Sequence, residues 1–167
     1  AAVGLLLGET PALIAQGLVS YQASGMRQNI YEQDGYHIYA DCYNASPDAM
    51  EATLSVLGGM AGDGRRFAVL GSMLELGDYA EEGHRRAGRA AAQYADALYA
   101  YGPDAAAMVA GAREKGMEHA YAFDDQTALV AALREDAKKG DALLFKGSRG
   151  MRMERALAMF LGEEVEA

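Results

Sequence analysis

Apolar residues recur along the chain in two patterns, which predict alternating strands and helices. Some runs have the two-residue period of a strand or are wholly apolar, and others repeat every three or four residues, as amphipathic helices do. Strands are predicted over residues 28–33, 36–41, 66–71, 97–101, 119–123 and 141–146. Helices are predicted over residues 48–60, 79–94, 104–115, 125–139 and 149–161, preceded by two short helices within residues 1–21.

The alternation of strands and helices determines the predicted fold class. At this spacing, consecutive strands join through right-handed βαβ units and form a parallel sheet. The first two strands differ, because Asp34-Gly35 between them favours a tight hairpin turn with positive φ at both central residues. We therefore predict an α/β, Rossmann-like three-layer fold of about six strands, mostly parallel with one antiparallel strand, and helices on both faces.

The segment 36–47, YHIYADCYNASP, predicts a strand that turns into a helix. Asp41 ends the strand, and Ser46 before a proline is typical of a helix start. In open α/β sheets, ligands bind outside the carboxyl ends of the strands. Aspartate also caps turns, but Ser46 already occupies the capping position here. Asp41, Tyr43 and Asn44 are therefore candidate ligand-binding residues.

A second candidate is the basic loop after the last predicted strand, which begins with Lys146 and contains Arg149 and Arg152. Its glycines allow a ligand to approach the backbone, and it leads into a predicted helix, whose start attracts anions. Cations at a helix start are unfavourable unless an anion joins them. The alternative is a solvated basic turn, and the charges favour the anion site.

The loop 71–77 and the helix after it contribute two weaker candidates. Glu75 lies in an LELG turn that can be purely structural, and His84 on an amphipathic helix is typical of a packed or surface histidine. The chain contains no GxxxxGK[ST] phosphate loop, no GxGxxG after a strand and no Cys/His set with metal-ligand spacing. No metal site is therefore predicted, and a dinucleotide enzyme is poorly supported.

Composition narrows the classes of function. Of the 167 residues, 51% are apolar, which permits a substantial core and argues against disorder. The net charge of −9 argues against a general nucleic-acid binder, and no apolar run is long enough to predict a membrane span. Cys42 is the only cysteine, so no internal disulfide is possible, which fits a cytoplasmic location.

Three motifs, in this order, resemble the Mur ligases. They are DCYNASPDAM at 41–50, VLGSMLELG at 69–77 with a histidine following, and FKGSRGMRME at 145–154. The resemblance covers essentially the whole chain. It implies that residues 1–22 are the helical end of the family's central ATP-binding domain, and that residues 23–167 are its C-terminal Rossmann-like domain. The abrupt start on an apolar helix also suggests a piece of a longer protein.

Among the Mur ligases, the motifs are most similar to the members that join D-alanyl-D-alanine to UDP-N-acetylmuramoyl-tripeptide in peptidoglycan precursor synthesis. The resemblance implies that ATP, with Mg²⁺, phosphorylates the tripeptide carboxylate and that the dipeptide amine attacks the acyl phosphate. It also implies that the C-terminal domain closes on the central domain to complete the site. Because the phosphate loop and the Mg²⁺ ligands lie in the other domains, this chain alone is expected to hold no cofactor and to be inactive.

The resemblance also assigns residues to the nucleotide side of the site. Arg27 matches an arginine that reaches the ATP phosphates, and Asp41 matches an aspartate that binds the ribose. Tyr43, Asn44 and Pro47 match the rest of the elbow, which is the turn 41–47 between the strand and the helix and lies beside the nucleotide. These five residues are the predicted ATP-binding set of this domain.

Lys146, Ser148 and Arg149 match the loop expected near the incoming dipeptide and the reacting carboxylate, and Lys146 and Arg149 are the catalytic candidates. An arginine fork suits the carboxylate of a dipeptide. The competing interpretation is a free-standing Rossmann-like module that binds a nucleotide or a partner without catalysis.

Overall fold

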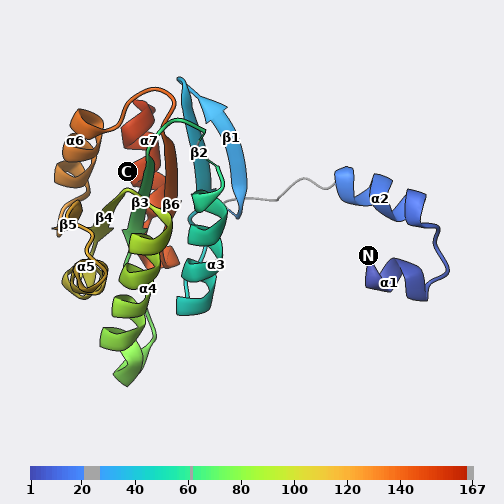
Figure 1. The fold of residues 1–167 in the computed structure, drawn as a ribbon, viewed down its shortest axis with the longest axis horizontal. Coiled ribbons are helices and arrows are strands. Elements are labelled where there is room, and N and C mark those ends of the chain that lie inside the picture. The colour runs from blue at the N-terminus through green and yellow to red at the C-terminus, as the bar shows by residue number, and fades with distance from the viewer. Residues whose placement is uncertain (21–26, 61, 165–167) are drawn as a thin grey trace.

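The computed structural model describes residues 1–20, 27–60 and 62–164 and contains one sheet of six strands (Figure 1). The strands are β1 (Asn29–Gln33), β2 (Tyr36–Asp41), β3 (Arg66–Gly71), β4 (Ala97–Tyr101), β5 (Ala120–Phe123) and β6 (Ala142–Lys146). The helices are α1 (Ala2–Leu6), α2 (Pro11–Val19), α3 (Pro47–Gly58), α4 (Ala80–Tyr94), α5 (Ala105–Glu114), α6 (Gln126–Asp136) and α7 (Met153–Leu161). The sheet order is β1-β2-β6-β3-β4-β5, with β1 antiparallel to β2 and the other neighbours parallel. The predicted α/β fold, with one antiparallel strand in a mostly parallel sheet, is confirmed.

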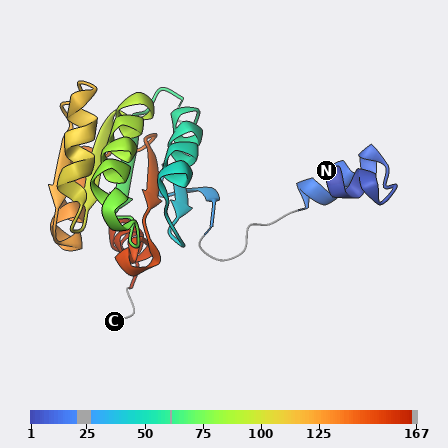
Figure 2. The ribbon, with the colours of Figure 1, turned by 90° about the horizontal axis from the view of Figure 1, so that it is seen from below.

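Helices cover both faces of the sheet (Figures 1 and 2). On one face, Leu54 of α3 and Met108 of α5 share a core cluster with Leu70 of β3. On the other face, Leu133 of α6 and Phe160 of α7 belong to a second cluster. The chain crosses the sheet between β5 and β6, so that β6 lies between β2 and β3. Because the chain comes back in this way, residues far apart in sequence lie side by side at the carboxyl ends of the strands, which we call the carboxyl edge of the sheet.

Side chains cap the starts of two helices that begin with proline. The Ser46 hydroxyl accepts a hydrogen bond from the Ala49 N–H at 3.3 Å, so α3 begins at the proline that follows. The Thr10 hydroxyl accepts from the Leu13 N–H at 3.3 Å and caps α2 in the same way. The start predicted from Ser46 before proline is confirmed, and α2 begins with the same pattern.

The helix predicted over residues 125–139 ends at Asp136, three residues before its predicted end. Ala137 has φ −75° and ψ 140°, which is extended rather than helical. The Asp141 carboxylate accepts the Lys138 N–H at 2.7 Å. Asp141 lies just before β6 and only three residues from Lys138, so this contact is a local turn, but the same carboxylate also accepts the Arg65 N–H at 2.8 Å. The end of α6 is therefore set by a turn that a contact with the residue before β3 holds in place.

The two predicted N-terminal helices are present as α1 and α2, and neither has a buried residue. Large apolar side chains on them face solvent, including Leu6 at 87% and Val19 at 88% exposure. Figure 1 draws them apart from the sheet. The predicted domain boundary at residues 22 and 23 lies outside the described residues.

α4 and α5 cross with almost no space between their backbones. A Cβ atom at Gly88 would lie 1.9 Å from the Met108 carbonyl oxygen, and one at Gly111 would lie 2.1 Å from the Arg85 carbonyl oxygen. Two glycines therefore permit this contact, one from each helix. A Cβ on either helix would force the two backbones apart.

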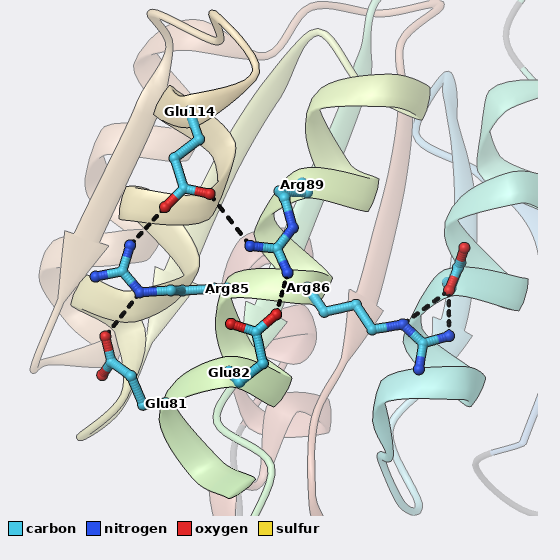
Figure 3. Close-up of polar contacts among 7 residues, drawn as sticks. Glu81, Glu82, Arg85, Arg86, Arg89 and Glu114 are labelled. Carbon is cyan, nitrogen blue, oxygen red and sulfur yellow. Dashed lines mark hydrogen bonds and ion pairs between the residues drawn. The ribbon is translucent and has the colours of Figure 1, made fainter.

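Charged side chains surround this crossing (Figure 3). Arg85 and Arg89 of α4 both pair with Glu114 of α5, at 2.6 and 3.2 Å, and these hydrogen bonds lower the pKa of Glu114. Figure 3 shows Arg86 extending away from α5; it pairs with Glu51 of α3 at 2.5 Å. The pairs are exposed, so they mainly orient the helices rather than stabilise the fold.

Cys42 is expected to resist alkylation while the domain is folded. Its side chain is 1% exposed, its Sγ donates to the Phe145 carbonyl at 3.4 Å, and burial raises its pKa to about 12. Because the thiolate is the reactive form, iodoacetamide should modify the native protein at least ~100-fold more slowly than the urea-unfolded protein. Equal rates would contradict this burial.

The same shift predicts a dependence of stability on pH. A group whose pKa is raised by folding contributes fully below its ordinary pKa of 9.0, and the contribution is lost as the pH rises toward about 12. The unfolding free energy of the native sequence should therefore fall more between neutral and alkaline pH than that of Cys42→Ala. Urea titrations of both proteins measure this difference, and parallel curves would exclude it.

Candidate functional site

The last residues of β2 and β6 form the centre of the candidate site. Asp41 and Lys146 are register partners in this parallel pair. The Lys146 ammonium lies 2.5 Å from Asp41 Oδ2 and donates to the Asn44 carbonyl at 2.8 Å. Lys146 is only 2% exposed. A buried ammonium therefore joins the end of β2, the elbow after it and the end of β6.

A pocket of about 330 Å³ opens beside this pair. Its lining residues are Arg27, Gln28, Asp41, Tyr43, Asn44, Ala49 and Lys146. The Arg27 guanidinium carbon lies 3.9 Å above the centre of the Tyr43 ring, within the range of a cation–π interaction. The Gln28 N–H donates to Asp41 Oδ1 at 3.2 Å. The pocket thus combines a guanidinium, an aromatic ring and an oriented carboxylate, a set suited to a polar ligand that carries an anionic group and hydroxyls.

Five of the residues singled out from the sequence line this one pocket: Arg27, Asp41, Tyr43, Asn44 and Lys146. Pro47 is the first residue of α3 and does not line it. In the sequence Lys146 belongs to the basic loop, whereas in the structure its ammonium points to Asp41. Gln28 and Ala49 were missed, because Gln28 contributes a backbone N–H to Asp41, which any residue except proline could supply.

Ser148 and Arg149 lie on the loop beyond Lys146, outside this pocket. Ser148 is buried, and its hydroxyl accepts the Leu74 N–H at 2.8 Å. Arg149 is exposed and pairs with Glu154 at 3.3 Å. α7 begins only at Met153, after a short 3-10 turn, so the helix predicted from residue 149 starts four residues late. The left-handed Arg152, with φ 46°, separates the turn from the helix.

Within residues 1–20, 27–60 and 62–164, no group of three or more His, Cys, Asp or Glu side chains is arranged to hold a metal ion. In the same ranges, no helix is both long and apolar enough to cross a membrane.

Residues 26–149 match the family described as "Mur ligase, glutamate ligase domain". The chain belongs to the Mur ligase family. The matched range contains the whole pocket around Asp41 and the loop as far as Arg149. The family inferred from three sequence motifs is thereby confirmed.

Similar Mur ligases are known from both sequence and structure. UDP-N-acetylmuramoyl-tripeptide–D-alanyl-D-alanine ligase of Bacillus subtilis (strain 168) is 36% identical over 156 residues, which cover 92% of this chain and 34% of that protein. The crystal structure of MurF ligase from Thermotoga maritima in complex with ADP has a TM-score of 0.81 at 33% identity, covering 97% of this chain and 36% of that one. MurF from Acinetobacter baumannii has a TM-score of 0.83 at 29% identity, covering 97% of this chain and 35% of that one. The chain spans about a third of the length of these relatives.

Proposed function

We propose that this chain is the C-terminal domain of an ATP-dependent ligase that joins D-alanyl-D-alanine to UDP-N-acetylmuramoyl-tripeptide in peptidoglycan precursor synthesis. The observation that carries the proposal is the 36% identity to the Bacillus subtilis ligase of that name, over 92% of this chain. The reaction would pass through an acyl phosphate, which the dipeptide amine attacks. Both the substrates and ATP are polar metabolites, and the single reduced cysteine fits a cytoplasmic enzyme.

In this proposal, residues 1–22 belong to the central ATP-binding domain and residues 23–167 form the closing domain. The exposed apolar side chains of α1 and α2 support the assignment, because so short a pair of helices cannot bury these side chains alone. The central domain would supply their covering surface, together with the phosphate loop and the Mg²⁺ ligands.

The pocket around Asp41 is the proposed nucleotide side of the site. Arg27 would neutralise phosphate charge, Asp41 would accept hydrogen bonds from ribose hydroxyls, and Tyr43 and Asn44 would border the nucleotide. Pro47 would act indirectly by starting α3 behind the elbow. A relative that crystallised with ADP supports a nucleotide at the family's site. Because Lys146 contacts Asp41, its proposed role is to hold that carboxylate in place.

Ser148 and Arg149 are proposed for the acceptor side. The exposed Arg149 guanidinium would bind the dipeptide carboxylate, while the buried Ser148 hydroxyl would fix the loop that carries it. Arg149 would thus contact the substrate directly, and Ser148 would act through the loop backbone.

The test compares the full-length protein encoded by the complete reading frame with the 167-residue chain. With ATP, Mg²⁺, UDP-N-acetylmuramoyl-tripeptide and D-alanyl-D-alanine, the full-length protein should release phosphate only when both substrates are present. The 167-residue chain should release none. A full-length protein that lacks activity with these substrates, or a chain that is active alone, would refute the proposal.

Replacing Arg149 with alanine in the full-length enzyme should weaken use of D-alanyl-D-alanine more than use of ATP. Removing a charged hydrogen-bonding partner costs about 1.5–3 kcal/mol, which corresponds to a rise in KM of roughly 10- to 100-fold for the dipeptide. Steady-state kinetics with each substrate varied in turn would measure this. Equal changes in both KM values would argue against the assignment.

A further inference from the structure

The carboxyl ends of β6 and β3 form a second place where a ligand could bind. These strands are neighbours, but α4 after β3 and α7 after β6 cover opposite faces of the sheet. The loops 72–76 and 147–152 therefore diverge from the same edge. Such a switch in direction is where ligands bind in open α/β sheets. The pocket beside Asp41 lies at β2 and β6, so it does not include this neighbouring position, where the proposed function places only Ser148 and Arg149.

Buried polar groups fix the backbone of the loop 72–76. Its first three N–H groups donate in turn to the Tyr101 carbonyl at 2.9 Å, to His84 Nε2 at 2.8 Å and to Ser148 Oγ at 2.8 Å. The Ser148 N–H donates back to the Ser72 carbonyl at 3.2 Å. The loops after β3, β4 and β6 are therefore joined by hydrogen bonds and should move as one unit.

His84 contributes to this arrangement through both ring nitrogens. It is completely buried, at 0% exposure. Because Nε2 accepts the Met73 N–H, Nδ1 carries the ring proton and donates to the Ala80 carbonyl at 2.6 Å. Asp104 is the acidic group that faces the ring, with Oδ2 at 3.7 Å from Nε2. Both ring nitrogens are thus hydrogen-bonded to backbone groups, so His84 acts as a positioning group. It positions the loop that follows Met73.

The residue presented by this loop is Glu75. Its φ is +68°, in the left-handed region that glutamate rarely adopts, and its side chain is exposed. Among the described residues, its carboxylate has no hydrogen-bond or ion-pair partner. Backbone strain maintained by a rigid surrounding is typical of functional positions. The structure therefore holds an unpaired carboxylate in a fixed, unfavourable backbone conformation at the carboxyl edge.

The loops that carry Arg149 and Glu75 contact each other directly, through Leu74 on one loop and Ser148 and Gly150 on the other. A Cβ atom at Gly150 would come within 2.8 Å of Leu74 Cδ1, so the Leu74 side chain covers Gly150. Each charged residue is the chain neighbour of one member of this contact. A carboxylate and a guanidinium carried by two contacting loops match the two ends of a zwitterion.

We propose that Glu75 binds the ammonium group of a zwitterionic dipeptide whose carboxylate is bound by Arg149, and that His84 positions Glu75. The inference rests on the proposed function, in which D-alanyl-D-alanine is the acceptor. It adds the residue that receives the amine end of the dipeptide. A carboxylate at this point would fix the amine end of the bound dipeptide relative to its carboxylate end.

The test uses the full-length enzyme with the variants Glu75→Gln and Glu75→Gly. Both should raise the KM for D-alanyl-D-alanine about tenfold or more, because a charged hydrogen bond is replaced by a neutral one or lost. The KM for ATP should stay within about twofold, since Glu75 lies outside the nucleotide pocket. Glu75→Gly should also raise the melting temperature, because glycine adopts positive φ without strain. A purely structural Glu75 would give the gain in stability without the loss of dipeptide affinity.

Asp78→Asn is the matched control, because it removes an exposed carboxylate three residues further along the chain, in the 3-10 turn Gly77–Tyr79. It should leave both KM values unchanged.

For the positioning role, His84→Gln keeps an acceptor on a long side chain, whereas His84→Phe leaves the Met73 N–H unpaired. The His84→Phe variant should raise the KM for the dipeptide and leave the KM for ATP unchanged. The His84→Gln variant should show a smaller rise in the KM for the dipeptide.

The outcomes separate the two proposals. If the unaltered full-length enzyme does not respond to D-alanyl-D-alanine, the proposed function fails. If it responds and Glu75→Gln keeps the native KM for the dipeptide, the inference about Glu75 fails while the function stands. Equal changes from Glu75→Gln and Asp78→Asn would also overturn it, because they would indicate a general effect of charge.

Discussion

Replacing Lys146 with methionine is expected to lower the unfolding free energy by about 3–5 kcal/mol, the usual cost of leaving one member of a buried ion pair alone. Methionine keeps the length and volume of the side chain, so little packing is lost. Asp41, which is 7% exposed, would retain the Gln28 N–H but lose the ammonium at 2.5 Å. Urea unfolding, followed by circular dichroism, measures the change.

The double variant Asp41→Asn with Lys146→Met is the control for this prediction. It removes both charges, and it should recover much of the loss because replacing both partners of a buried pair is often close to neutral. In the full-length enzyme, by contrast, the double variant should remain impaired with ATP. If Lys146→Met alone is as stable as the native chain, the ammonium is not an essential partner of Asp41.

Gly88→Ala should destabilise the domain by about 3 kcal/mol or more, because overpacking at a backbone contact cannot be relieved by a change of rotamer. In an ordinary helix the same substitution is favourable by about 1 kcal/mol. Here the added methyl would meet the Met108 carbonyl at 1.9 Å and separate α4 from α5. Thermal unfolding should therefore show a lower melting temperature and not a higher one.

Gly59→Ala provides the comparison for this helix crossing. Gly59 has φ −98°, and a Cβ there would meet only the Val56 carbonyl oxygen, at an ordinary 3.6 Å. This variant should be nearly neutral or slightly stabilising. If both alanine variants gave the same melting temperature, the close contact of α4 and α5 would not matter for stability.

Local sequence signals predicted the fold well. Alternating apolar residues identified each strand to within one residue at either end, and Asp34-Gly35 identified the antiparallel pair. Ser46 before proline fixed the start of α3, because a cap acts within one turn. The end of α6 was missed because Asp141, which accepts the Lys138 N–H there, is itself held by the N–H of Arg65, 76 residues away in the sequence.

The candidate site was predicted in part. Asp41 and its neighbours were identified because they end a strand, which is a local property. The partner of Asp41 was not, since Lys146 lies 105 residues further along the chain and meets it only through the order of strands. A packed His84 was one of two alternatives, but its hydrogen bond was not predicted, because the Met73 N–H from which it accepts belongs to a loop with no regular pattern.

The place of β6 also has a consequence for how the domain is made. This strand, residues 142–146, lies between β2 and β3 and is the last of the six to leave the ribosome. Until it emerges, β2 and β3 have no strand between them and the sheet remains divided. Folding must therefore wait for nearly the whole chain, and contacts between such distant segments form slowly. A nascent chain stalled before β6 should remain a target for chaperones, whereas adding one short strand would complete the sheet.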